Sequence, residues 1–122
     1  MYTPEYQNKL TAFVNRLAVE QNARKVRDYP RAVSLHNEPV THNTGKVYTR
    51  IVIGSSCQYF VRVADGTIFA SASYKTPNFV RSYGTLDTID QFDWSGYNAV
   101  ALPNSNFVMK STDGHYMTAR PK

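Results

Sequence analysis

The sequence predicts an α+β fold in which an N-terminal amphipathic helix packs on an antiparallel sheet of hairpins. Three observations favour this fold. An apolar stripe with helical spacing lies near the N-terminus, β-rich segments fill the middle of the chain, and two Asp-Gly pairs separate neighbouring β segments. The length of 122 residues is that of one ordinary domain, so we expect a single domain over residues 1–122.

The helix is expected from about residue 4 to residue 24. Thr3 precedes Pro4, and threonine caps the free amides of a helix whose first position suits proline. One turn after Tyr6, apolar residues follow the spacing i, i+3, i+4, i+7 and i+8: Leu10, Phe13, Val14, Leu17 and Ala18. This spacing predicts a face that packs on the sheet, and a partner-binding face is the alternative.

Basic residues gather toward the end of this helix: Arg16, Arg24, Lys25, Arg27 and Arg31. They allow two interpretations. One is a patch that faces phosphates, and the other is a solvated helix end, where cations complement the helix dipole.

Residues 28–45 are expected to form a long connection with one short extended piece around Val33 to Leu35, because proline, asparagine and aspartate interrupt any regular period. His36, Glu38 and His42 raise the question of a metal site in this connection. Their spacing lacks the helical i, i+4 geometry that aims two imidazoles at one ion, and a third strong ligand is missing. We therefore predict no metal.

The middle of the chain predicts three adjacent antiparallel strands, over residues 46–53, 57–63 and 67–74. Residues 54–56 turn the chain between the first two strands, and a two-residue type I′ turn at Asp65-Gly66 joins the second and the third. In the second strand, alternation places Tyr59, Val61 and Val63 on one face, with Gln58, Phe60 and Arg62 on the other.

The C-terminal third predicts shorter elements. Asp87, Asp90 and Asp93 recur every third residue, which is typical of a short helical turn with an acidic outer face. The order of a calcium loop is missing there, and we predict neither a metal site nor a catalytic carboxylate pair. Residues 98–103, "NAVALP", indicate a short strand, and residues 107–118 indicate a second hairpin around Asp113-Gly114.

Composition excludes several classes of protein. The chain is 42% hydrophobic and 19% charged, which argues against disorder, and it lacks the run of about 20 apolar residues that a membrane span needs. The first residues lack the apolar segment of a secretory signal, so we expect a cytoplasmic protein. Cys57 is the only cysteine and is expected to be a small buried side chain.

The central third of the chain resembles a group of small uncharacterised proteins encoded by tailed bacteriophages. The resemblance covers about residues 46–86 and rests on "KVYTRIV", "YFVRVADGTIFASASYKTPN" and "VRSYGTL". The phage proteins often have tryptophan where Tyr74 stands. The resemblance implies a phage-encoded protein in the cytoplasm of the host, and it supplies no catalytic residues.

The net charge of +5 favours an anionic partner. Cations and aromatic residues interleave across the predicted sheet: Lys46, Tyr48, Arg50, Tyr59, Phe60, Arg62, Phe69, Tyr74, Lys75 and Arg81. Single strands are held by such cationic grooves and aromatic platforms. We therefore predict a protein that binds nucleic acid, single-stranded rather than duplex, and the expected contact residues are Arg50, Arg62, Tyr74, Lys75 and Arg81.

The alternative is a protein-interaction module, either a virion component or an inhibitor of a host enzyme. Its aromatic anchors would come from "FVRSYGTL", residues 79–86, and from Trp94 and Tyr97. The sequence lacks the common motifs of nucleotide hydrolysis, dinucleotide binding, zinc chemistry and acyl transfer, so we expect no catalysis and no cofactor. The oligomeric state stays open.

Overall fold

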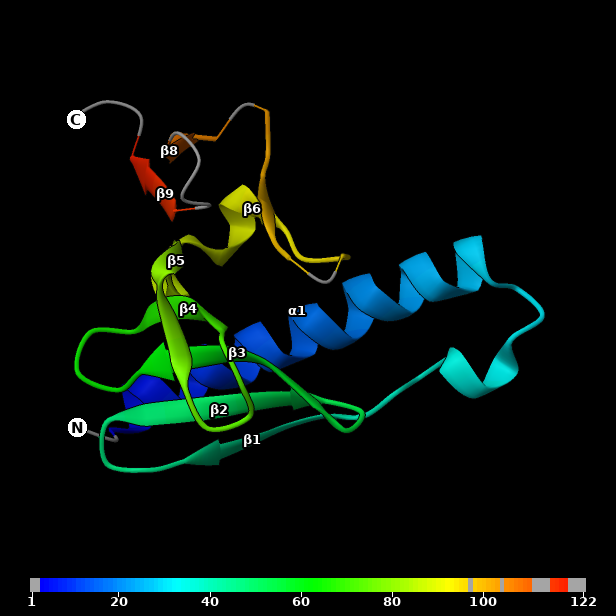
Figure 1. Ribbon diagram of the computed structural model, residues 1–122, viewed down its shortest axis with the longest axis horizontal. Helices are drawn as coiled ribbons and strands as arrows, with labels where there is room; N and C mark the ends of the chain where they lie inside the picture. The colour runs from blue at the N-terminus through cyan, green and yellow to red at the C-terminus, as the bar shows by residue number, and fades with distance from the viewer. Residues whose placement is uncertain (1–2, 97, 104, 111–114, 119–122) are drawn as a thin grey trace.

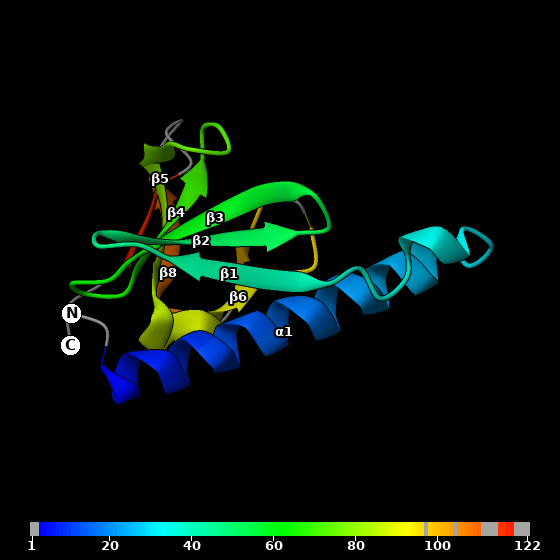
Figure 2. The same cartoon turned by 90° about the horizontal axis from the view of Figure 1, so that it is seen from below.

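The computed structural model describes residues 3–96, 98–103, 105–110 and 115–118. One long helix lies against a bent sheet of antiparallel strands (Figures 1 and 2), which confirms the α+β fold with a helix packed on hairpins. The helical elements are α1 (Pro4–Asp28), η1 (Val33–Leu35) and η2 (Leu86–Gln91). The strands are β1 (Val40–Thr44), β2 (Tyr48–Ile53), β3 (Ser56–Arg62), β4 (Thr67–Ser71), β5 (Pro77–Thr85), β6 (Phe92–Asp93), β7 (Val100–Ala101), β8 (Phe107–Lys110) and β9 (His115–Thr118).

Helix α1 begins as predicted and ends later than predicted. The Thr3 hydroxyl accepts a hydrogen bond from the Tyr6 amide (3.1 Å), and Pro4 occupies the first turn. The helix continues past residue 24 to Asp28, because no helix breaker occurs before Pro30 and the basic last turn suits the helix dipole. None of the helices in the described ranges is long and apolar enough to cross a membrane.

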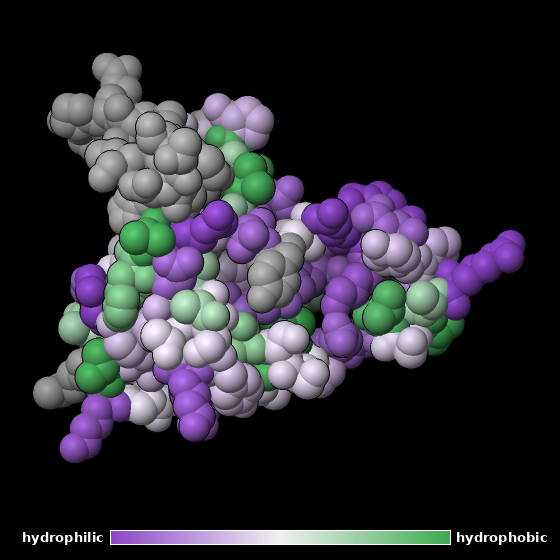
Figure 3. All heavy atoms as spheres, viewed as in Figure 1, coloured by the Kyte–Doolittle hydropathy of each residue, from purple (hydrophilic) through white to green (hydrophobic). Residues whose placement is uncertain are grey.

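The last turns of α1 extend past the sheet and carry η1 (Figure 1). Most of the basic side chains in this region pair with neighbouring carboxylates: Arg16 with Glu20, Arg24 and Arg27 with Asp28, and Lys25 with Glu38. These ion pairs favour the interpretation of a solvated helix end over that of a phosphate patch. Figure 3 shows apolar side chains at the same end of the molecule, where Val33 is 70% exposed.

The main sheet has seven strands in the order β1-β2-β3-β4-β5-β9-β8. Strands β1 to β5 run antiparallel, each paired with the next along the chain. The hairpin of β8 and β9 joins them through a parallel contact at Tyr83 and Tyr116, and β6 and β7 form a separate two-stranded ribbon. The predicted strands near residues 100, 107 and 115 are therefore present, while the Asp113-Gly114 turn lies outside the described residues.

The prediction of a long connection over residues 28–45 is wrong in two places. Val33–Leu35 forms a 3₁₀ helix rather than an extended piece, and Val40–Thr44 forms strand β1. The sequence of β1, "VTHNT", lacks an apolar alternation because this strand lies at the edge of the sheet with its middle residues exposed. The strand is formed by its backbone pairing with β2, from Val40↔Ile53 to Thr44↔Thr49, which the side-chain pattern does not predict.

The hairpin of β3 and β4 is present, but its turn differs from the predicted two-residue type I′ turn. The connection spans residues 63–66, the Gly66 amide bonds to the Arg62 carbonyl (2.7 Å), and Gly66 alone has positive φ, at 74°. Asp65 keeps negative φ because its carboxylate binds the Arg62 side chain and the Thr67 amide. Side-chain bonds thus select a longer turn than the Asp-Gly pair alone predicts.

Strand β5 contains a large bulge, over residues 79–81, that was not predicted from the sequence. Phe69 of β4 pairs with Ser82, while the next residue, Ala70, pairs with Asn78. Residues 79–81 are therefore displaced from the ladder, and Phe79 and Val80 are 54% and 61% exposed.

The core lies between α1 and the inner face of the sheet. The helix contributes the predicted stripe, and β2 to β5, η2 and β6 close the core: its largest fully buried side chains include Phe13, Tyr59, Tyr83, Phe92 and Trp94. Trp94 is fully buried, and its indole N–H donates to the Ile89 carbonyl (2.7 Å). This residue is a core side chain and not an interface anchor, while Tyr97 lies outside the described residues.

Candidate nucleic-acid interface

Strand alternation creates a second face, which we call the outer face: the side of β2, β3 and β4 turned away from α1. Along β2, Thr49, Ile51 and Ile53 are buried toward the helix, so Tyr48 and Arg50 lie on the outer face. The register then pairs Arg50 with Phe60, and Phe60 with Phe69. One cation and two aromatic rings thus form a row across three strands.

The outer face holds a small aromatic cluster of its own. The Tyr48 ring lies 6.1 Å from the Phe60 ring and 6.3 Å from the Phe69 ring, both edge to face, and Phe79 of the β5 bulge leans back to 5.3 Å from Phe69. Cys57 is buried beside these rings, as expected, and burial raises the pKa of its thiol. These packed rings form an apolar floor beneath the exposed side chains of the outer face.

The turn between β4 and β5 bends over this floor. Figures 1 and 2 place the turn on the side of β2 opposite α1. Arg50 fastens it, because its Nε donates to the Tyr74 carbonyl (2.7 Å). The Arg50 guanidinium carbon lies 5.0 Å from the centre of the Tyr74 ring and 5.8 Å from that of Phe60. Tyr74 itself remains 54% exposed.

A hollow of about 340 Å³ opens beside this turn. Its described lining residues include three cations and two aromatic rings but no carboxylate: Asn43, Gly45, Lys46, Val47, Tyr48, Arg50, Phe60 and Lys75. Asn43 and Gly45 were not anticipated, because they belong to β1 and its turn, a region that the sequence assigns to a loop, and Val47 was predicted only as a strand residue. A prediction that β1 pairs with β2 would have placed Asn43 and Gly45 beside Arg50.

Of the five predicted contact residues, Arg50 and Lys75 line the hollow, and Tyr74 lies next to it, in contact with Arg50. Arg62 also lies on the outer face, with its guanidinium carbon 5.2 Å from the Phe69 ring centre, but it donates two hydrogen bonds to Asp65 (3.0 and 2.8 Å). This pair neutralises the Arg62 charge locally. Arg81 stands in the β5 bulge and does not line the hollow.

The Arg62–Asp65 pair makes a testable contribution to stability. The Arg62 hydrogen bonds lower the pKa of Asp65 from 3.8 to about 2. The folded state therefore favours the ionised form, so this stabilisation is complete above about pH 4 and is lost as the pH falls toward 2. Because the Asp65 side chain is 49% exposed, solvent screening limits the effect.

We expect Asp65→Asn to lower the free energy of unfolding by about 0.5–1 kcal/mol at pH 7. Urea denaturation of both proteins at several pH values checks this result. The difference between them should shrink from pH 4 to pH 2. A difference that stays constant over that range would show that the carboxylate charge contributes nothing.

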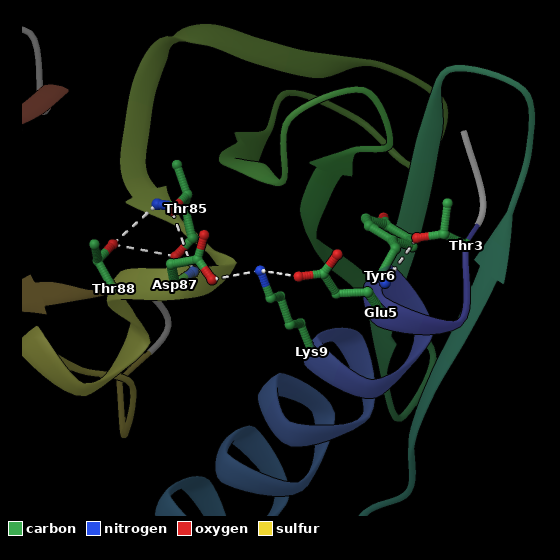
Figure 4. Close-up of polar contacts among 7 residues, drawn as sticks. All are labelled: Thr3, Glu5, Tyr6, Lys9, Thr85, Asp87 and Thr88. Carbon is green, nitrogen blue, oxygen red and sulfur yellow. Dashed lines mark hydrogen bonds and ion pairs between the residues drawn. The ribbon is translucent and has the colours of Figure 1, made fainter.

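A second hollow, of about 300 Å³, lies between the start of α1 and η2. Figure 4 shows three of the ionic groups that line it: the Lys9 ammonium lies between the carboxylates of Asp87 (2.8 Å) and Glu5 (3.5 Å). The Asp87 hydrogen bond is the main cause that raises the pKa of Lys9. These charges pair with one another and connect α1 to η2. This hollow is therefore a weaker candidate for a ligand site than the outer face.

No group of three or more metal-ligating side chains occurs in the described part of the chain. Of the residues considered for a metal site, His36 bonds to the Tyr29 carbonyl and Glu38 pairs with Lys25. His42 stands on β1 with an exposed side chain.

These features define a class of protein: a small α+β protein whose helix covers one face of an antiparallel sheet, leaving a cationic and aromatic hollow on the other. Comparison with known proteins narrows the class no further. No family model, no curated protein and no solved structure matches the chain.

Proposed function

We propose that this protein binds single-stranded nucleic acid at the hollow of the outer face and carries out no catalysis. The observation that carries the proposal is the convergence of Lys46, Arg50 and Lys75 around aromatic rings, with no carboxylate among the lining residues that the structure describes. Three cations close together neutralise consecutive phosphates, and an exposed ring stacks a base that is not already paired. A duplex hides the faces of its bases, so the same arrangement favours a single strand.

The side chains in and beside the hollow would have different roles in binding. Arg50 is held against Tyr74 and Phe60, so it presents its charge from a fixed position. Tyr74 offers the exposed ring at the rim. Lys46 and Lys75 are exposed residues in turns on either side of the hollow, and their flexible side chains follow a backbone whose sequence varies. The arrangement thus favours binding without base preference.

The resemblance of residues 46–86 to uncharacterised phage proteins suggests where the protein would act, and not what it binds. The cations and aromatic rings that line the hollow come from this segment, and of the described lining residues Asn43 and Gly45 lie outside it. A phage-encoded accessory protein would meet its nucleic acid in the cytoplasm of the host.

Titration of labelled oligonucleotides at several salt concentrations tests the proposal. Lys75→Ala and Lys46→Ala should each weaken binding of an oligo-dT and reduce the slope of log K against log salt by about 0.7. Tyr74→Ala should weaken binding by about 1–3 kcal/mol with little change of slope, because stacking releases no ions.

Arg27→Ala is the matched control, because it removes one positive charge from the far end of α1, where the side chain is exposed. It should leave the slope almost unchanged. Equal slopes for Lys75→Ala and Arg27→Ala would mean that only the overall charge attracts the oligonucleotide. Failure of the unaltered protein to bind at about 50 mM salt would reject the proposal.

That failure would favour a protein-interaction module, which one further observation supports. The β5 bulge presents Phe79 and Val80 with more than half of each side chain exposed, beside Arg81. Apolar side chains next to a cation are common in protein interfaces.

A further inference from the structure

We infer that the protein forms a two-fold dimer in which β1 pairs antiparallel with β1 of a second copy, centred on His42. The sheet order places β1 at the edge. Figure 2 looks onto that edge, and none of the drawn helices or strands crosses it. The middle residues of the strand, Thr41, His42 and Asn43, are exposed.

The hydrogen-bond pattern of β1 identifies which backbone groups the edge presents. The Gly54 amide bonds to the Pro39 carbonyl, and the Gly45 amide bonds to the Tyr48 carbonyl, both at 2.9 Å. In an antiparallel ladder such bonds recur at every second residue, so Thr41 and Asn43 direct their backbone groups toward β2. Val40, His42 and Thr44 therefore direct their amides and carbonyls outward.

This outward set is symmetric about His42, which makes the edge complementary to itself. Pairing His42 with its own mate places Val40 opposite Thr44 of the second copy, so each of the three facing pairs can exchange two backbone hydrogen bonds. A register shifted by one residue would set outward groups against inward ones. A register shifted by two residues would keep only two facing pairs, so the register centred on His42 forms the most hydrogen bonds.

Strand β1 also lacks the features that protect an edge strand from pairing with another chain. Val40–Thr44 contains no charge and no proline, and its pairing with β2 has no bulge. Glu38, just before the strand, is already held by Lys25 of its own chain, so it does not repel a second copy. The symmetry of the outward backbone groups about His42 argues for a second copy as the partner rather than a foreign strand.

A dimer of this kind would place both outer faces on the same side, because the two-fold axis stands normal to the sheet. The hollows, each lined by Asn43 and the β1–β2 turn, would then belong to one continuous surface. The value of that surface for a nucleic-acid strand rests on the proposed function, whereas the dimer itself does not.

Sedimentation equilibrium without nucleic acid tests the dimer, with a chain mass of 13.8 kDa as reference. The unaltered protein should approach twice this mass as its concentration rises. His42→Pro removes an outward amide and its ring crowds the partner, while the bonds to β2 remain. It should weaken the dimer about 30-fold or more, because two central hydrogen bonds are lost. His42→Ala keeps the backbone amide and should still form the dimer.

Disulfide trapping tests the centre of symmetry. Under oxidation His42→Cys should give a linked dimer, since directly paired residues stand about 5.5 Å apart, within the range that a disulfide spans. Thr41→Cys, one residue away and equally exposed, should not, because it faces Asn43 of the second copy. A monomeric mass at every concentration, an unchanged dimer with His42→Pro, or equal linking by both cysteines would overturn the inference. None of these outcomes bears on whether the monomer binds an oligonucleotide.

Discussion

Phe13→Ala is expected to lower the free energy of unfolding by about 3–5 kcal/mol. The Phe13 side chain is fully buried where α1 meets the sheet, and its ring stands edge to face against Trp94 at 4.8 Å and Tyr59 at 6.0 Å. Removing it would leave a cavity that these large rings cannot fill without leaving their own contacts. Urea denaturation at pH 7 measures the loss.

Val19→Ala on the same helix is the control for this result. Val19 is 69% exposed, so its truncation should change the stability by less than about 0.5 kcal/mol. If both variants were equally stable, α1 would not pack on the sheet through the Phe13 side.

Gly84→Ala is expected to destabilise the protein by about 2–4 kcal/mol. Gly84 has φ of +68°, a region that favours glycine, and an added Cβ would overlap the Thr88 hydroxyl. That hydroxyl accepts from the Thr85 amide (3.0 Å) and so caps η2. The same Cβ would stand 3.3 Å from the Phe107 ring, so the alanine would strain the backbone and displace neighbours on both sides.

Gly45→Ala provides the comparison. Gly45 lacks positive φ, and a Cβ there would have its nearest neighbour at 3.6 Å, which is ordinary contact. Thermal denaturation should therefore show a large decrease in Tm for Gly84→Ala and almost none for Gly45→Ala. Similar values for the two variants would contradict the assigned strain at Gly84.

Elements with strong periodic patterns could be predicted from the sequence. The stripe of α1 repeats with the helical period, and the capping residues Thr3 and Pro4 precede it. Strand β2 alternates buried and half-buried side chains. In each case the local period and the burial agree.

In β3 the predicted facing is correct for Tyr59 and Val61, which lie in the core, and for Phe60, which lies on the outer face. It is wrong for Gln58, which accepts a hydrogen bond from Gln21 of α1, because a register shift in the pairing with β2 interrupts the alternation there.

Elements stabilised by partners distant in the sequence escaped prediction. Strand β1 is polar and exposed, and β5 has its alternation broken by the bulge at residues 79–81. The turn at residues 63–66 depends on side-chain bonds from Asp65 that dipeptide statistics do not contain. The candidate site depends on these elements, since the β1–β2 turn supplies Lys46 and the β4–β5 turn supplies Lys75.

The sequence by itself determined the fold class, the buried stripe of α1 and the supply of cations and aromatic rings in the middle of the chain. Only the tertiary structure decided how those residues are used. It buried Tyr59 and Trp94 in the core, paired Arg62 with Asp65, and brought Lys46, Arg50 and Lys75 to one hollow. The reason is physical: side-chain spacing encodes which face of an element is apolar, whereas strand register and the bending of a turn depend on backbone partners far away in the chain.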